Sequence, residues 1–200
     1  MKRILSLSPA MFLISIALMA CQGAPPPPIP PDSTGVVALG QLPTSSDGTF
    51  TLTSSEVAEG EALPKEFTCD GSSVTLPLSW RGVPEGTKSF AVIMHHIPGP
   101  NDSHWYWILY DIPADVTGLG KNSSGVGTLG NNSVNGKTEY APPCSKGPGE
   151  KIYTYTVYAL SAEPQLSVHA TGVTRDVLLD AIKDITLASA ALNVTYTRPG

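Results

Sequence analysis

The stretch KIYTYTVYAL at residues 151–160 carries the clearest fold signal in the chain. Successive side chains of a β-strand point to opposite faces, so alternate residues of this stretch would share a face. The second face would carry threonine, tyrosine and leucine, residue types that pack well in strands. The stretch therefore predicts a long strand, whose first face holds Tyr153, Tyr155, Val157 and Ala159.

Strand signals recur on the amino-terminal side of this stretch. Residues 89–95 are apolar and rich in strand-forming types. Residues 104–112 are apolar or aromatic at nearly every position, as expected of a strand that is covered on both faces. Weaker strand signals lie at residues 50–54 and 190–197.

One helix is predicted near the carboxyl end. Thr174 can cap it, Asp176 would lie in its first turn, and Val173 can pack against a residue one turn further on. Many strands followed by a single late helix predict a mainly β protein, a β-sandwich-like core with a helical cover. The apolar residues at helical spacing are Leu178, Ala181, Ile182 and Ile185.

The amino-terminal residues predict export. Lys2 and Arg3 precede an apolar run that is too short to span a bilayer and is typical of a signal peptide. The run ends in Leu-Met-Ala before Cys21, which is similar to the bacterial lipoprotein signal in which the cysteine is acylated. A plain secretory signal, with Cys21 as a bystander, is the alternative.

Three segments follow from this pattern. Residues 1–20 are expected to be a signal peptide, and residues 21–46 a lipid-anchored, proline-rich linker. The linker contains PPPPIPP, which favours a stiff polyproline spacer that would hold the domain away from a membrane surface. Residues 47–200 are expected to form the folded domain, and the protein to be a cell-envelope membrane lipoprotein.

Charge and cysteine content narrow the possible functions. The formal net charge is −5 and no basic cluster stands out, which argues against nucleic-acid binding. With Cys21 assigned to lipid, Cys69 and Cys144 remain. An even pair in an exported protein favours a disulfide, and two buried free thiols are the alternative.

Several phrases in a fixed order resemble a known family. The chain contains FTCDG at 67–71, LPLSW at 76–80, HW at 104–105 and YDIPA at 110–114. A proline-rich loop with Cys144 and a YAL phrase at 158–160 come later. Together these are similar to the phosphatidylethanolamine-binding protein (PEBP) family, in particular its bacterial Raf-kinase-inhibitor-like YbhB/YbcL branch.

The resemblance implies a sandwich of antiparallel sheets with one or two peripheral helices and a small pocket at one end. In the family that pocket accepts anions such as a phosphate or a phospholipid head group. Family members are described as lipid binders, kinase or protease inhibitors, or scaffolds. We therefore expect the ligand-binding residues to be Asp70, His96, His104, Tyr140, Lys151 and Tyr153. We expect no catalytic residue, no cofactor and no bound metal.

The sequence also departs from the family pattern at this pocket. A phrase with two aspartates in the family reads HIPGP at 96–100, and the glycine-proline loop reads APPCSK at 141–146. Because proline has no N–H, this loop offers fewer backbone donors to an anion. Lys151 stands about where the family has a histidine. We therefore expect side-chain cations to hold the anion.

Two alternatives remain open from the residues. The pocket rim and the long loop at 115–139 could dock on a kinase or protease and inhibit it. A metal-dependent hydrolase is the less favoured option, since His95 and His96 are adjacent and would point to opposite faces of a strand. The chain also lacks a Gly-x-Ser-x-Gly phrase around a nucleophile.

Overall fold

The computed structural model describes residues 48–99, 102–146 and 148–198. The expected signal peptide at 1–20, the acylation site Cys21 and the linker at 21–46 lie outside the described residues. Within the described ranges no helix is long and apolar enough to cross a membrane.

A five-stranded antiparallel sheet forms the larger layer, in the order β6-β4-β3-β7-β8. The predicted strand at 151–160 is β7 (Lys151–Leu160), which lies inside the sheet between its partners β3 and β8. β3 and β4 each contain a continuous buried run, because both of their faces are covered there, whereas β8 alternates between more buried and more exposed residues. The bounds are Ser89–Gly99 for β3, Asp102–Pro113 for β4, Thr128–Leu129 for β6 and Thr186–Tyr196 for β8.

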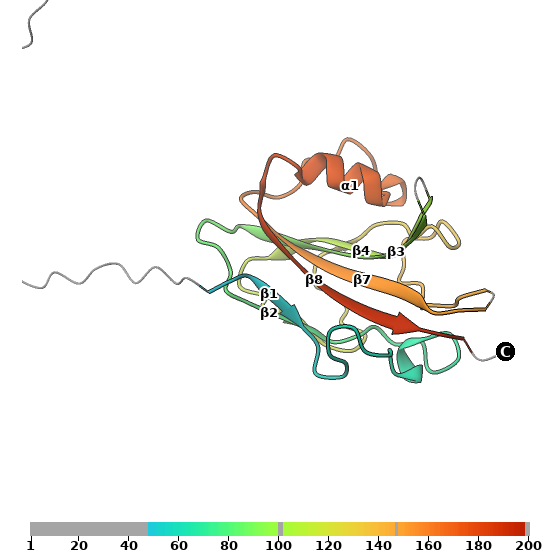
Figure 1. Cartoon of the computed structure of the whole chain (residues 1–200). Coiled ribbons are helices and arrows are strands. Elements are labelled where there is room, and N and C mark those ends of the chain that lie inside the picture. Colours follow the sequence, from blue (N-terminus) through green and yellow to red (C-terminus); the bar gives the residue numbers. More distant parts are fainter. Residues whose placement is uncertain (1–47, 100–101, 147, 199–200) are drawn as a thin grey trace, which may run out of the picture. The chain divides into compact units, whose positions relative to one another are not determined.

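A second, three-stranded antiparallel sheet faces one side of the first, in the order β1-β2-β5. Its strands are short: β1 is Thr51–Thr53, β2 is Leu78–Arg81 and β5 is Gly118–Leu119. Figure 1 shows this sheet below the larger one, and the helix α1 (Arg175–Ile182) above it. The predicted sandwich of antiparallel sheets with a peripheral helix is confirmed. Two short 3-10 helices, at Lys65–Phe67 and Ala170–Gly172, are also present.

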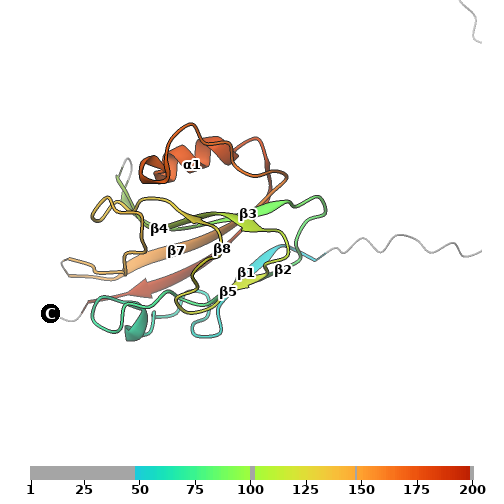
Figure 2. The ribbon, with the colours of Figure 1, turned by 180° about the vertical axis from the view of Figure 1, so that it is seen from behind.

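Two apolar cores lie on opposite faces of the five-stranded sheet. The core between the sheets takes the face of β7 that carries Tyr153 and Tyr155, as the alternation predicted, together with Trp80 from β2. The other core lies under α1, where Leu178 and Ile182 are buried against the sheet. The view from behind in Figure 2 shows the same layers.

The predicted helix cap is present. The Thr174 side chain accepts a hydrogen bond from the Val177 N–H at 3.2 Å. Val173 and Leu178 both belong to the core under the helix, as the staple requires. The helix itself ends at Ile182, so Ile185 packs against that core from outside it.

The outer edge of β8 is paired over its carboxyl-terminal half. The Gly60 N–H donates to the Asn193 carbonyl and the Leu63 N–H to the Thr195 carbonyl, each at 2.8 Å. The Thr195 N–H donates in return to the Glu61 carbonyl at 2.8 Å. Residues 60–63, the edge strap, thus satisfy backbone groups that an open sheet edge would expose.

Cys69 and Cys144 form a disulfide, with their Cα atoms 5.2 Å apart. The cross-link joins residues that are 75 positions apart. A loop of that size is expected to stabilise the fold by about 4 kcal/mol in the chain-entropy model.

Candidate functional site

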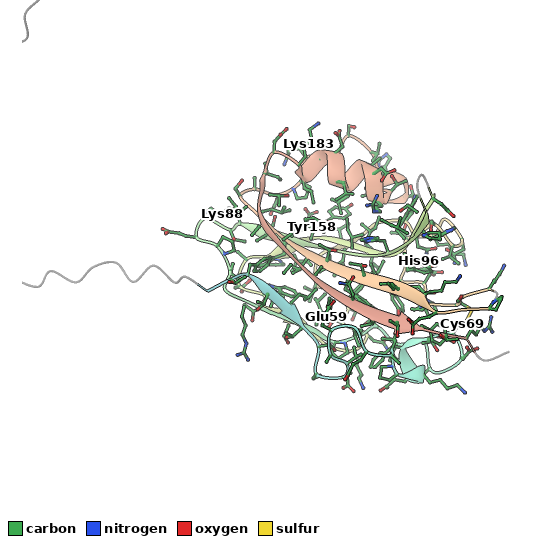
Figure 3. All side chains as sticks on the ribbon, in the orientation of Figure 1. Glu59, Cys69, Lys88, His96, Tyr158 and Lys183 are labelled. Atoms are coloured by element: carbon green, nitrogen blue, oxygen red, sulfur yellow. A yellow bond between two sulfur atoms is a disulfide. The ribbon has the colours of Figure 1, made fainter. Side chains whose placement is uncertain are left out.

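A pocket of about 490 Å³ opens at the end of the sandwich where β3 and β4 are joined. Its walls come from the end of β3, the starts of β4 and β7, the loop around Ser133 and the segment that carries Cys144. Figure 3 shows His96 at this end of the domain, and Lys88 at the other. The lining residues are His96, Pro98, Asp102, His104, Tyr106, Ser133, Val134, Pro142, Cys144, Ser145, Lys146, Lys151 and Tyr153.

His96 is held in a defined orientation. Its Nδ1 lies 2.7 Å from the Ile152 carbonyl, which can only accept, so Nδ1 carries the hydrogen and donates it. The ring also packs against Tyr153, with centroids 5.5 Å apart. The second nitrogen, Nε2, is thereby left for other partners and accepts a hydrogen bond in the neutral ring.

His104 forms a pair with Asp102 at the rim. The His104 Nε2 lies 3.2 Å from the Asp102 carboxylate, and both side chains are about half exposed. Exposed pairs of this kind contribute little to stability. Among the described residues this pair occupies Nε2, and the opposite nitrogen, His104 Nδ1, is the one that could turn to a ligand.

Lys146 and Lys151 bring two positive charges to the pocket. In residues 48–99, 102–146 and 148–198 neither lysine has a carboxylate within ion-pair distance. An ammonium group without a partner at a concave surface attracts anions and can donate charge-assisted hydrogen bonds to them.

Hydroxyl groups complete the donor set. Tyr106 and Tyr153 meet edge to face, with centroids 5.3 Å apart, and burial raises the pKa of both, so they stay protonated and can donate. Ser145 is only 6% exposed, and its Oγ has no partner among the described residues. A buried hydroxyl without a partner is costly, and an oxygen-rich ligand would satisfy it.

Four of the six predicted ligand residues meet in this pocket: His96, His104, Lys151 and Tyr153. The structure does not bring Tyr140 there. Its ring packs on Trp107 beside a different hollow, and its hydroxyl donates to the Phe67 carbonyl at 3.3 Å.

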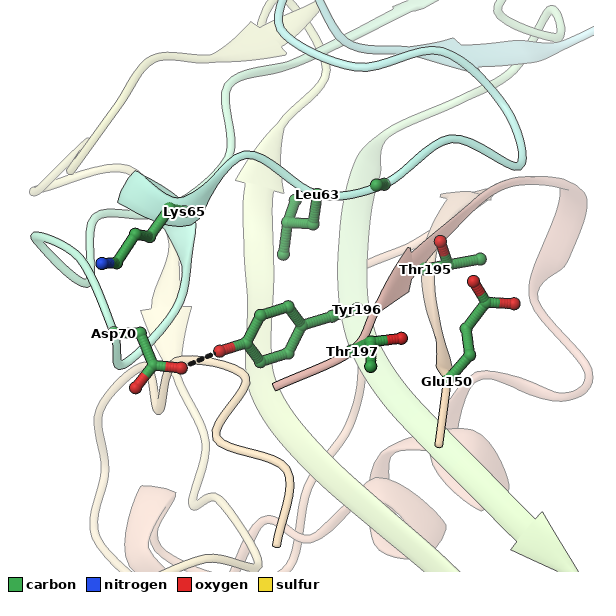
Figure 4. A pocket seen from close by; sticks show the side chains of 8 residues that line it. Leu63, Lys65, Asp70, Glu150, Thr195, Tyr196 and Thr197 are labelled. Atoms are coloured by element: carbon green, nitrogen blue, oxygen red, sulfur yellow. Dashed lines mark hydrogen bonds between the residues drawn. The ribbon is translucent and has the colours of Figure 1, made fainter. Parts of the chain in front are cut away.

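Asp70 lies in a separate groove, which also contains Tyr196 at the end of β8 (Figure 4). Its carboxylate accepts a hydrogen bond from the Tyr196 hydroxyl and pairs with Arg198 at 3.1 Å. The hydrogen bond from Tyr196 is the main reason that the pKa of Asp70 lies below its ordinary value. Asp70 therefore fastens the FTCDG segment to β8.

His95 points away from the pocket, since it alternates with His96 along β3. It packs on the helix side of the sheet, where burial, and then the charge of Arg175, lower its pKa to about 4. In the described ranges no group of three histidine, cysteine or acidic side chains is placed to hold a metal ion.

The lining residues that sequence reasoning did not single out are Tyr106, Ser145 and Lys146 above all. Tyr106 lies in the aromatic run at 104–112, which could not be divided from sequence into core and pocket positions. Ser145 and Lys146 follow Cys144 directly in the sequence. The predicted disulfide between Cys144 and Cys69 was therefore the sequence feature that could have located these two residues.

Comparison with known proteins finds a matching family model and relatives that align with most of this chain. A family model described as phosphatidylethanolamine-binding protein matches residues 53–197. UPF0098 protein YbcL of Escherichia coli is 33% identical over 164 residues, 74% of this chain and 87% of that protein. The "Putative lipoprotein LppC" of Mycobacterium tuberculosis is 30% identical over 176 residues, 84% and 85% of the two chains.

Solved structures agree on the fold. A PEBP homologue from Chlamydia trachomatis superimposes with a TM-score of 0.68 at 28% identity, over 75% of this chain and 98% of that one. Crystalline E. coli YbcL gives 0.67 at 27% identity, over 75% and 99%. Fold and pocket define a β-sandwich protein with a cation-lined cavity at one end. The chain belongs to the phosphatidylethanolamine-binding protein family, as its sequence phrases indicated.

Proposed function

We propose that the end pocket binds a small ligand through an anionic group of the phosphate or phospholipid-head-group kind. The observation that carries this proposal is the convergence of Lys146 and Lys151, neither of them paired in the described ranges, with the partnerless hydroxyl of Ser145. Ammonium and hydroxyl groups of this kind can bind and orient an anion, so the role that we propose for the pocket is binding.

The anion is held by side chains rather than by backbone amides. Two prolines occupy the loop that forms one wall, and they have no N–H to donate. Lysine ammonium groups and the hydroxyls of Tyr106 and Tyr153 supply donors in their place. His96 Nε2 gains a donor role when the ring is protonated.

The pocket mouth also has an apolar side. Val134 lines the pocket and is 56% exposed, so the mouth offers an apolar surface beside the lysines. An anionic group that carries an apolar tail would cover it. This supports a lipid head group over free phosphate, in keeping with the ligand in the family's name.

The test is a calorimetric titration of the purified chain, once with phosphoethanolamine and once with inorganic phosphate. The double variant Lys146→Ala/Lys151→Ala is expected to bind at least about tenfold more weakly, because each lost charge-assisted bond is worth about 1.5–3 kcal/mol. Its affinity should also depend less on salt concentration.

The matched control is Lys88→Ala, which removes an exposed lysine at the opposite end of the domain (Figure 3). It should bind like the unchanged chain. Equal affinity of the double variant and the control, or no saturable binding by the unchanged chain, would refute the anion pocket.

We also propose that the protein is an exported envelope lipoprotein, anchored through acylated Cys21. The name of the mycobacterial relative supports this, since that protein is described as a lipoprotein and aligns with 84% of this chain. Metabolic labelling with a radioactive fatty acid should mark the full chain and not a Cys21→Ser variant. Label retained by the variant would contradict acylation at this position.

A further inference from the structure

One wall of the pocket has no regular structure of its own. Residues 142–146 supply Pro142, Cys144, Ser145 and Lys146 to the lining, yet they form neither helix nor strand. The adjoining Ala141 is fixed, because its N–H donates to the Tyr106 carbonyl at 2.8 Å. This wall, the Cys144 wall, contains two of the proposed anion-binding groups.

Few hydrogen bonds hold the Cys144 wall in place, although Pro143 and Ser145 are buried. Within the described ranges, its one backbone hydrogen bond is from the Cys69 N–H to the Pro143 carbonyl, at 3.0 Å. No side-chain hydrogen bond is formed by these residues there, and the Ser145 Oγ is without a partner. The covalent bond between Cys144 and Cys69 is therefore the strongest tether that the wall has.

The other end of this tether is firmly anchored. Cys69 follows the buried Phe67 and Thr68, and it precedes Asp70, which is bound to Tyr196 and Arg198. These last two residues belong to the end of β8 and its extension, so the anchor is part of the main sheet. Asp70 and the disulfide thus connect the pocket wall to the sandwich, although Asp70 does not line the pocket.

We propose that the Cys69–Cys144 disulfide is a positioning element of the pocket, and that its reduction weakens ligand binding without unfolding the domain. This proposal rests on the anion-binding function proposed above. Both cysteines are half-buried rather than enclosed, so a small thiol can approach them.

The redox step requires a dithiol as reductant. One thiolate of the dithiol attacks a sulfur of the disulfide and forms a mixed disulfide, which releases the other cysteine as a thiolate. The second thiol of the reagent then displaces the remaining cysteine. The products are two protein thiols and one oxidised dithiol, with two electrons and two protons transferred to the protein. Ser145 and Lys146 are then held only by the chain on either side.

The test compares the affinity of the full chain for phosphoethanolamine in three states: oxidised, reduced by dithiothreitol, and reoxidised after the reagent is removed. We expect reduction to weaken binding at least about tenfold and reoxidation to restore it. Far-ultraviolet circular dichroism at the assay temperature should stay constant. A Cys69→Ser/Cys144→Ser variant should bind like the reduced chain and should not respond to dithiothreitol.

A second comparison separates positioning from general loosening. In a Ser145→Ala/Lys146→Ala background the groups that the wall presents are already gone, so reduction should change the affinity less than about twofold. In the Lys88→Ala background it should have its full effect. An equally large loss in both backgrounds would overturn the positioning role.

The remaining outcomes are also decisive. Equal affinity of the oxidised and reduced chains leaves the anion pocket in place and overturns the proposal about the disulfide. Loss of the β-sheet signal on reduction overturns it too, because the bond would then hold the whole fold. If neither form binds phosphoethanolamine or phosphate, the function proposed above fails, and this inference fails with it.

Discussion

At the scale of single residues, two neighbouring histidines on β3 have opposite environments. His96 lines the pocket, and its ring is fixed by the Ile152 carbonyl. His95 faces the helix side, and its Nδ1 is buried without a partner in the described ranges. The alternation of a strand predicts this division, and it was foreseen from the sequence.

The environment of His95 makes the protein sensitive to acid. Burial, and then the charges of Arg175 and His96, lower its pKa in the folded protein to about 4, against an ordinary value of 6.5. Between these values the unfolded chain takes up a proton that the folded chain does not. The free energy of unfolding is therefore expected to fall as the pH is lowered from 6.5 to 4.

A His95→Leu variant should lose this part of the pH dependence. With a discount for partial exposure, the expected difference between pH 7 and pH 4 is about 2 kcal/mol. Urea unfolding curves at several pH values would measure it. The same substitution at the exposed His169 is the control, and parallel curves for His95→Leu and the unchanged chain would contradict the assignment.

Asp70 shows the limit of motif transfer at this scale. The FTCDG phrase that contains Asp70 is typical of the family, and the Asp70 side chain was expected to bind the ligand. Its carboxylate instead binds Tyr196 and Arg198, residues more than a hundred positions later in the chain. Such a partner cannot be read from local sequence, because it depends on how the last strand passes the first loop.

At the scale of elements, the cap of α1 offers a direct test. The Thr174 hydroxyl satisfies the Val177 N–H at the start of the helix that covers one core. Thr174→Ala should cost about 1 kcal/mol, which corresponds to a fall of about 2–4 °C in melting temperature. Thr174→Ser keeps the acceptor and should melt close to the unchanged chain. Equal losses in both variants would show that the cap is not the cause.

The long strands were predictable and the short ones were not. β3, β4 and β7 are long enough for their apolar pattern to identify them, and the predicted bounds of β7 agree with the structure. β5 and β6 have two residues each, too few to show any period. They lie inside the segment at 115–139, which was expected to be a loop, and they form because the neighbouring sheets offer them partners.

β8 also begins earlier than the predicted strand at 190–197. It starts at Thr186, since β7 offers pairing partners along its whole length. The amino-terminal half of β8 is rich in alanine and serine, residue types with weak strand preference. Tertiary pairing decides the structure there, so no local signal marks the start of the strand.

At the scale of the whole molecule, the sandwich gathers a pocket from five separate stretches of chain. The end of β3, the starts of β4 and β7, the loop around Ser133 and the Cys144 wall meet at one end of the domain. Sequence phrases located the histidines, Lys151 and Tyr153, because these lie on strands with a clear pattern. The Cys144 wall has no such pattern, and its contribution of Ser145 and Lys146 became visible only in three dimensions.

The edge strap has a consequence for the order in which the molecule is made. Residues 60–63 emerge from the ribosome well before the carbonyl groups that they bind, because those groups belong to Asn193 and Thr195 in β8. The domain cannot close this sheet edge until β8 has been synthesised. Such long-range pairing folds slowly. During that interval the strands already made have unpaired edges, which favour aggregation.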